Sequence, residues 1–510
     1  MPQAYEVYAY TIDTLRRLLA EKAGTPEHVI ATKRHLVYFE EYFQALGAKT
    51  VIVENNYVDR DYLEDFAAYY VRCFHRYERH CARLHFFDAA FTEADFVDLL
   101  RGTSAPLTPD ILQQKYLGFV VVKPLPQTVV GRTCLKTYPE AGHRLFPITR
   151  SYNVHLFGIP LTVDSLAFQE QDAVAAACAT SALWSAFQGT GRQFQHHIPS
   201  PVEITRAATS HVPLDTRTLP NNSGLNPTQM ADAIRSVGLE PFLVNADDEY
   251  VLKSTLYAYL HGQIPILLGI DLHDPSAPNV SLGLHAVTVA GYSLGSTQQT
   301  AYQQQGTNLR SFRMDKIYAH DDQIGPFARM IFTGGASFRT SWLNGMGTAV
   351  LNAQATLMLV PLYHKIRIPI QTIQDMVFSF DSLVEALRQS NLLNLAQPLE
   401  WDVYLTDVNT LKAELLGSLA LPGDYRARVL TYPMPRFLWR ATALTSGTPI
   451  LDLLFDATDI EQGCFFVCAI EYAPAVVQTL RTATQALVQS NTTLSPTDRR
   501  LFEWFATAIL

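Results

Sequence analysis

The apolar residues of this chain come in short runs, and this limits the folds that it can adopt. The most continuous run, IPILLGI at residues 264–270, has the length of a buried strand and is far shorter than a membrane-spanning helix. Runs such as YLGFVVV and HAVTVAGY also indicate strands, whereas TEADFVDLL after Thr92 has the spacing and the cap of a short helix. The sequence therefore predicts an α+β protein without a membrane-spanning segment.

The length of the chain predicts more than one domain, because a single hydrophobic core rarely organises 510 residues. We expect an N-terminal α/β domain over residues 1–150, a central domain over 151–345 and a C-terminal α/β domain over 346–510. The roles of the two flanking domains are unknown. The junctions contain no Gly/Ser-rich or Pro-rich linker, which predicts that the flanking domains pack on the central one.

Charge and cysteine content exclude some classes of function. The net charge of −9, without a block of Lys or Arg, argues against nucleic acid and anionic membranes as partners. The N-terminus lacks the pattern of a secretory signal, and six cysteines are too few for a disulfide framework in so long a chain, so a cytoplasmic protein is expected. The sequence has no Gly-x-x-x-x-Gly-Lys-Ser/Thr phosphate loop, and no cofactor is predicted.

The segment QEQDAVAAACATSALWSAF, residues 169–187, contains the first candidate catalytic residue. Cys178 lies where a run of alanines turns into an amphipathic helical pattern, so it can occupy a helix N-terminus. At that position the unpaired N–H groups and the helix dipole favour the thiolate, which is the nucleophilic form of cysteine. A lone cysteine among alanines is more often a small buried apolar residue, so this segment alone does not establish a catalytic role.

Two further candidates lie at strand ends. His285 opens the predicted strand HAVTVAGY after a glycine-containing loop, where an imidazole can reach a cleft. Asp321 and Asp322 close the predicted strand KIYAHD, where a carboxylate can orient a neighbouring imidazole. Taken singly, a histidine is usually structural and an aspartate often caps a turn. Taken together, a thiol, an imidazole and a carboxylate are the groups that nucleophilic catalysis by cysteine requires.

In their order along the chain these segments resemble the papain-like cysteine peptidase superfamily, and within it the double-glycine, bacteriocin-processing type. The resemblance covers residues 165–330 and is carried by QEQDAVAAACATSALW, GLNPTQMADAIRSVGLEP, LHGQIPILLGI, LGLHAVTVAGY and YAHDDQIGPF. It implies a papain-like core, made of a helix lobe and an antiparallel sheet, between the N- and C-terminal α/β domains. It also implies a freestanding cysteine peptidase that acts on a protein or peptide substrate.

The resemblance further implies a role for each candidate residue. Cys178 would attack an acyl carbon, His285 would take and return the proton, and Asp321 would hold the imidazole in the useful tautomer. Asp321 is preferred to Asp322 because it directly ends the strand. Gln171 and the backbone N–H of Cys178 would form the oxyanion hole, and water would hydrolyse the thioester.

The sequence departs from the pattern of these peptidases at two points. They usually have the oxyanion-hole glutamine six residues before the cysteine, where this chain has Asp172, so Gln171 is one residue displaced and Gln169 is a second possibility. The residue after the cysteine is Ala179 instead of the frequent glycine. The same residues would also serve an acyltransferase or a catalytically silent peptide-binding module. Resistance to labelling by iodoacetamide or a thiol-directed epoxide would identify the silent module.

A metal site is a further alternative within residues 60–86, whose apolar spacing predicts a helix. The segment offers soft ligands in Cys73, His75, His80, Cys81 and His85. These residues lack CxxC or HxxxH spacing, and on a helix His75 would point away from the face shared by Cys73, His80 and Cys81. No metal site is therefore predicted.

Overall fold

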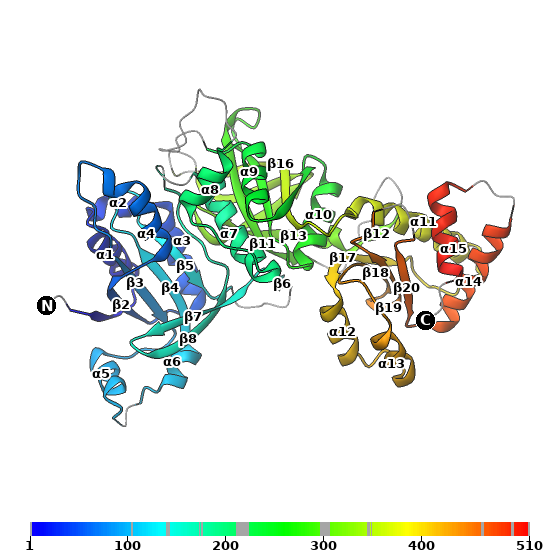
Figure 1. Cartoon of the computed structure of the whole chain (residues 1–510), viewed down its shortest axis with the longest axis horizontal. Coiled ribbons are helices and arrows are strands. Elements are labelled where there is room, and N and C mark those ends of the chain that lie inside the picture. The colour runs from blue at the N-terminus through cyan, green and yellow to red at the C-terminus, as the bar shows by residue number, and fades with distance from the viewer. Residues whose placement is uncertain are drawn as a thin grey trace. The chain divides into compact units, whose positions relative to one another are not determined.

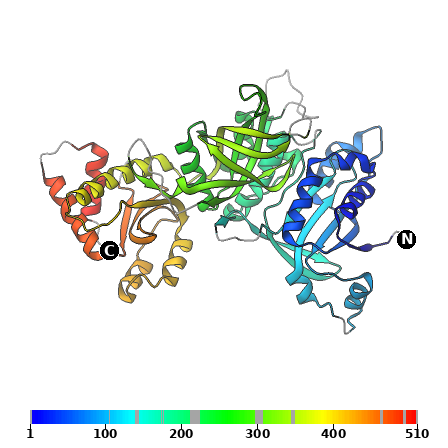
Figure 2. The same cartoon turned by 180° about the vertical axis from the view of Figure 1, so that it is seen from behind.

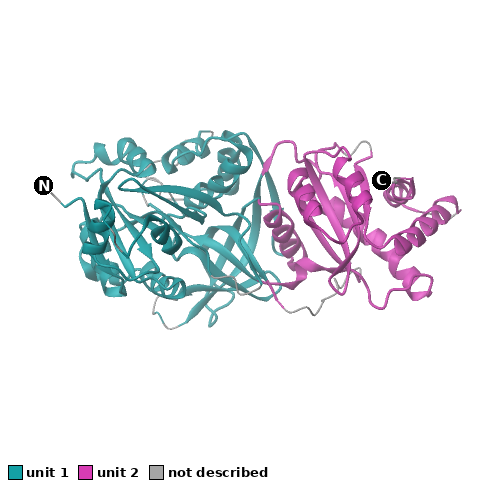
Figure 3. Cartoon of the chain, turned by 90° about the horizontal axis from the view of Figure 1, so that it is seen from below, with its two compact units in different colours: residues 1–247, 264–293, 316–361 teal, residues 248–263, 294–315, 362–510 magenta. Residues whose placement is uncertain are grey.

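The chain divides into two compact units. A computed structural model describes residues 3–103, 106–138, 143–172, 174, 177–210, 224–295, 306–343, 347, 349–460, 464–490 and 494–507. The predicted domain boundary at 345 lies outside the described residues, as do residues 211–223 and 296–305. Figure 3 colours the two units, which are Met1–Asp247, Ile264–Ser293 and Lys316–Pro361 for unit 1, and Asp248–Gln263, Leu294–Asp315 and Leu362–Leu510 for unit 2. The division into three domains stays a prediction.

The N-terminal part of unit 1 is a five-stranded antiparallel sheet in the order β1-β2-β3-β4-β5, drawn in blue to cyan in Figure 1. The helices around it include α1, which packs against β3, β4 and α3. Strand β4 is buried along its whole length, which confirms the strand predicted for YLGFVVV. The strands are β1 (Tyr5–Ala9), β2 (Thr50–Tyr57), β3 (Cys81–Phe87), β4 (Tyr116–Val122) and β5 (Val130–Leu135), and the helices are α1 (Ile12–Ala23), α2 (Glu27–Ala31), α3 (Arg34–Leu46), α4 (Arg60–Ala68), α5 (Glu93–Arg101) and α6 (Pro109–Lys115).

The helix predicted for residues 60–86 is wrong over its second half. Helix α4 ends at Ala68, and the last residues of that segment form β3 in the middle of the sheet. Every side chain of β3 is buried, and its backbone pairs with β2 on one side and β4 on the other. Tertiary pairing thus outweighs the local helical spacing. His85 is engaged in this sheet, where its ring nitrogens contact the Tyr116 hydroxyl at 3.0 Å and Glu54 at 3.3 Å.

Six further strands of unit 1 close into a barrel, drawn in green in Figure 2. Strand β10 pairs antiparallel with both β11 and β16, and this double pairing closes the ring. Strand β6 (Arg144–Leu145) adds to β11 and β9 (Leu239–Asn245) adds to β16. The strands predicted at IPILLGI, HAVTVAGY and KIYAHD all belong to the barrel. Its members are β10 (Ile266–His273), β11 (Ser281–Leu294), β13 (Met314–Asp321), β14 (Gly325–Gly334), β15 (Ser337–Leu343) and β16 (Val350–Tyr363).

Helix α7 (Cys178–Phe194) lies in the hydrophobic core of unit 1. Its residues 179–190 are all buried. Trp184 and Phe187 belong to one cluster of buried side chains that also contains Phe119 of the N-terminal sheet and Ala286 of the barrel. Helices α8 (Pro201–Ala208) and α9 (Pro227–Ser236) pack against α7. This shared core confirms the prediction that the N-terminal flank packs on the central part of the chain.

Unit 2 is built around a second five-stranded sheet in the order β12-β17-β18-β19-β20, in which β12 runs parallel to β17 and the other pairs are antiparallel. The mixed architecture of helices and several sheets is thus confirmed, while the papain-like core stays a prediction. Among the helices that the structure describes, none has both the length and the apolar composition needed to cross a membrane. The elements of unit 2 are α10 (Glu249–His261), β12 (Asn308–Leu309), α11 (Ile370–Gln389), β17 (Glu400–Asp407), α12 (Val408–Gly417), α13 (Gly423–Thr431), β18 (Phe437–Thr445), β19 (Thr448–Asp456), β20 (Phe466–Glu471), α14 (Pro474–Gln489) and α15 (Pro496–Thr507).

Candidate active site

Cys178 is the first residue of α7. The residue before it, Ala177, has no side-chain group that could cap the helix, and the first turn closes through the hydrogen bond from Ser181 N to Ala177 O at 3.0 Å. Cys178 is half-buried, whereas the residues that follow it in the helix are buried. The uncapped N–H groups of the first turn are therefore available to stabilise a negative charge at Cys178.

The residues that lead into the helix are fixed on the edge of the N-terminal sheet. Phe168 and Thr133 exchange two backbone hydrogen bonds of 2.8 and 2.9 Å. Glu170 accepts a hydrogen bond from Val130 N at 3.0 Å through its side chain and donates its own N–H to Val130 O at 3.0 Å. Strand β5 thus carries the polar segment that precedes the candidate nucleophile.

The three polar residues just before α7 differ in their environments. Asp172 is buried and its carboxylate accepts hydrogen bonds from the Tyr70 hydroxyl and from Val174 N, so it serves to fix this segment. Gln171 is half-buried. Gln169 is buried, and its side-chain amide nitrogen has no hydrogen-bond partner in the described part of the chain. The assignment of Gln171 to an oxyanion hole stays a prediction, with Gln169 as the second possibility.

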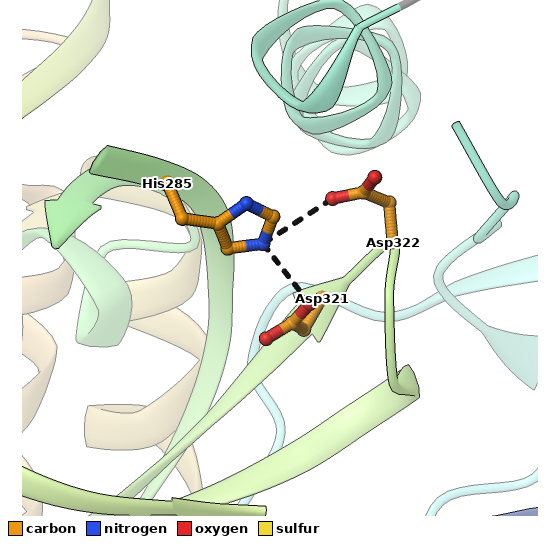
Figure 4. Close-up of side chains that lie close together, drawn as sticks. All are labelled: His285, Asp321 and Asp322. Carbon is orange, nitrogen blue, oxygen red and sulfur yellow. Dashed lines mark hydrogen bonds and ion pairs between the residues drawn. The ribbon is translucent and has the colours of Figure 1, made fainter. Parts of the chain in front are cut away.

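In strand β11, residues 281–284 are exposed and His285 is the first buried residue. Its ring points to the end of the adjacent strand β13, as Figure 4 shows, and Nε2 lies 3.0 Å from Oδ1 of Asp321 and 3.3 Å from Oδ1 of Asp322. Three residues further along β11, the Thr288 hydroxyl donates to the backbone oxygen of Ala182 in α7 at 2.5 Å. This bond ties the strand that carries His285 to the helix that begins at Cys178.

Trp342 covers the pair formed by His285 and Asp321. Its indole N–H donates to Oδ2 of Asp321 at 2.6 Å, and its ring meets the imidazole edge-on with the centroids 5.1 Å apart. Gln323 N donates to Oδ1 of the same aspartate at 3.1 Å. Trp342 was not predicted from the sequence, because it lies on β15 and nothing in its local sequence marks it as a neighbour of a histidine on β11.

The charges of this cluster shift the acidities of its members. Burial alone would lower the pKa of His285, but the carboxylates of Asp321 and Asp322 raise it well above its ordinary value. Burial would raise the pKa of Asp321, yet the imidazolium and the hydrogen bonds that this carboxylate accepts hold it below its ordinary value. Burial and the neighbouring charge of Asp321 raise the pKa of Asp322 to about 6. At neutral pH an imidazolium therefore faces an ionised Asp321.

Cys178 also acts on this imidazole. It adds to the rise in the pKa of His285, by less than the two carboxylates do. Because Nε2 is engaged by the two carboxylates, Nδ1 is the ring nitrogen that can exchange a proton with the thiol. The structure thus brings Cys178, His285 and Asp321 together, and it adds Asp322 as a second carboxylate on the same nitrogen.

His285, Asp321 and Asp322 also form a possible cation site, since one donor atom from each lies within 4.8 Å of the others. A histidine binds a metal ion only through a neutral ring nitrogen. The raised pKa of His285 favours the imidazolium, whose Nε2 carries a proton and faces both carboxylates. The two carboxylates thus stabilise a positive charge at this nitrogen, which the proton of the imidazolium supplies.

The two carboxylates give a testable pH dependence. In Asp322→Asn, one of the two charges that raise the pKa of His285 is removed, so the imidazolium should be lost at a lower pH. We expect the alkaline limb of the pH profile for turnover to move to lower pH. The exposed residue Asp110 on α6 provides the control, Asp110→Asn. An unchanged alkaline limb in Asp322→Asn would show that Asp322 does not act on His285.

These residues come from one helix N-terminus and from two adjacent strands of the barrel. Segments far apart in the sequence thus converge on a single buried imidazole. A scan against protein-family models finds no family that matches this chain, and a search of the curated proteins finds no match.

Proposed function

We propose that this protein is a cysteine peptidase that hydrolyses a peptide or isopeptide bond of a protein or peptide substrate. One observation carries the proposal: the buried imidazole of His285, which Asp321 holds at 3.0 Å, lies on the strand that is hydrogen-bonded to the helix beginning at Cys178, and Cys178 contributes to the raised pKa of that imidazole. A thiol nucleophile, its base and the group that orients the base are the parts that this chemistry needs.

The mechanism follows from the two ring nitrogens. Before the substrate binds, His285 has already taken the thiol proton on Nδ1, which gives a thiolate beside an imidazolium, and this thiolate attacks the carbonyl carbon of the substrate. The imidazolium then gives this proton to the leaving amine, which departs as the tetrahedral intermediate collapses to a thioester. A water molecule, deprotonated by His285, hydrolyses the thioester and releases the acid. Asp321 stays ionised throughout and stabilises the imidazolium through Nε2.

The choice of Asp321 as the orienting residue is supported by its contacts. It makes the shorter approach to Nε2, at 3.0 Å against 3.3 Å for Asp322, and it is held by Trp342 and by Gln323 N. The lowered pKa of Asp321 and the raised pKa of Asp322 favour the same choice. We assign the oxyanion hole to the Cys178 backbone N–H and Gln171, with Gln169 as the second possibility.

The architecture of unit 1 supports a papain-like core. A papain-like enzyme places its cysteine at the start of a helix that packs against an antiparallel sheet bearing the histidine. Helix α7 and the barrel have this relation, and the bond from Thr288 to Ala182 joins them close to the site. We place the protein in the cytoplasm, on the basis of its sparse cysteine usage.

The proposal is tested by terminal proteomics on a lysate treated with the wild type or with Cys178→Ala. We expect new peptide termini in the wild-type sample alone. The matched control is Cys464→Ala, which removes an exposed cysteine and should cleave like the wild type. Mass spectra also separate hydrolysis from acyl transfer. A hydrolysed product ends in a free acid, whereas a transferred product carries the added mass of the acceptor amine. Identical termini with and without Cys178 would refute the peptidase proposal.

A further inference from the structure

Three consecutive residues at the start of helix α3, Lys33, Arg34 and His35, contact three different parts of the candidate active site. Lys33 is the residue before the helix, and Arg34 is its first residue. Their targets are Glu170, Trp342 and Asp322, which lie in three separate segments far along the chain. The N-terminal part of unit 1 therefore reaches the site through a single short segment.

Lys33 holds the segment that leads into α7. Its ammonium group forms an ion pair with Glu170, whose carboxylate is buried and also accepts Val130 N. A buried carboxylate is stable as an anion only with such partners. The pair therefore fixes the path of the chain shortly before Cys178.

Arg34 lies over Trp342. Its guanidinium carbon is 4.6 Å from the centroid of the indole ring, which is the geometry of a cation–π contact. The indole N–H donates to Asp321, and the ring packs edge-on against His285. Arg34 thus packs on Trp342, which in turn contacts both His285 and Asp321.

His35 holds the turn that follows Asp321. Its Nε2 lies 2.9 Å from the backbone oxygen of Asp322, and because that oxygen only accepts, the ring must carry its proton on Nε2. Burial lowers the pKa of His35, so the ring donates this bond in its neutral form. The same ring packs against Phe168 in the segment that leads into α7, with the centroids 6.3 Å apart.

We propose that Lys33, Arg34 and His35 are positioning residues, which set the orientation of His285 and Asp321 relative to Cys178. This inference rests on the proposed function and extends it, since it makes the N-terminal part of the chain a working part of the active site. Arg34 acts through Trp342, and His35 acts through the backbone of Asp322. When either contact is removed, Cys178, His285 and Asp321 remain close together, but their side chains are held less rigidly.

Arg34 is suited to a test, because its replacement does not empty the core. Together with Lys33, Ser341 and Leu343 it lines a cavity of about 460 Å³. A shorter side chain enlarges this existing space and leaves the packed cluster around α7 untouched.

The experiment measures turnover and the rate of Cys178 alkylation by iodoacetamide across pH, in full-length variants. Arg34→Met should lower kcat about ten- to a hundredfold with little change in KM, because a displaced catalytic group loses rate more than substrate affinity. It should also slow alkylation more at mildly acidic pH than at alkaline pH, because the thiolate depends there on a well-held imidazolium. Arg34→Lys keeps the cation and should recover most of the loss.

His35 provides the second pair of variants, in which His35→Leu removes the donor to Asp322 and His35→Gln keeps one. We expect the leucine variant to behave like Arg34→Met and the glutamine variant to lie closer to the wild type. The matched control is Arg17→Met, since Arg17 makes a similar contact to Tyr8, at 4.9 Å, among the first elements of unit 1. Arg17→Met should change neither the rate of turnover nor the rate of Cys178 alkylation.

The outcomes separate this inference from the proposed function. If Cys178 of the wild type is selectively reactive and active, but Arg34→Met and His35→Leu match Arg17→Met in rates and in pH dependence, the positioning role is refuted and the peptidase proposal stands. If wild-type Cys178 shows neither turnover nor selective alkylation, the proposed function fails and this inference falls with it.

Discussion

Replacement of His285 by alanine is expected to lower turnover by about four to six orders of magnitude, because the thiol loses its base and the leaving amine loses its proton donor. The same change should move alkylation of Cys178 to higher pH, since the thiolate no longer has an imidazolium partner. In the wild type, Cys178 should be alkylated first at mildly acidic pH. The thiols of Cys81, Cys134 and Cys468 should react slowly, because burial raises their pKa.

Peptide mapping after a short exposure to iodoacetamide measures the alkylation of Cys178 and that of the other cysteines in one experiment. The control is His364→Ala, which removes an exposed histidine of unit 2 and should leave the rates unchanged. Asp321→Asn should lower turnover strongly and alkylation weakly, because this carboxylate orients and stabilises the base and does not touch the sulfur. If Cys178 is no more reactive than the other cysteines, and is unaffected by the loss of His285, then α7 is only a core helix.

The parts of the site that the sequence could predict are those at the boundaries of regular elements. Cys178 begins a helix and Asp321 ends a strand, as predicted, and both boundaries are visible in the local pattern of apolar residues. The predicted start of a strand at His285 is wrong by four residues, because β11 begins at Ser281 with exposed residues that the apolar pattern does not include. That pattern also located the barrel strands. A local pattern works here because period and capping are properties of neighbouring residues.

The residues that were missed depend on tertiary contacts. Arg34 lies over the ring of Trp342, and Trp342 packs against His285, although these residues stand far apart in the chain and no spacing rule connects them. Asp322 was considered only as a rival of Asp321, whereas both carboxylates contact the same ring nitrogen. The residues of β3 show the opposite failure, because their helical spacing was real but pairing with two neighbouring strands decided the structure.

Among the residues of α7, Trp184 is the one whose truncation should destabilise the protein most. The side chain is fully buried, its indole N–H donates to Oδ2 of Asp61 at 3.1 Å, and the guanidinium carbon of Arg132 lies 5.9 Å from its ring centroid. Asp61 is itself buried and paired with Arg132. Truncation therefore opens a cavity in the core shared by the N-terminal sheet and the barrel, and it also removes a donor from a buried carboxylate.

Trp184→Ala is accordingly expected to destabilise unit 1 by about 3–5 kcal/mol, which lowers the temperature of its unfolding transition by roughly 4–7 °C. Trp184→Phe keeps most of the volume and loses only the N–H, so it should cost about 1–3 kcal/mol. Differential scanning calorimetry measures both, with Trp504→Ala, at a half-buried tryptophan of unit 2, as the control that should leave the transition of unit 1 unchanged. Because α7 positions Cys178, the alanine variant should also lose selective alkylation of that cysteine at temperatures where the wild type keeps it. An alanine variant as stable as the wild type would mean that α7 is not part of the shared core.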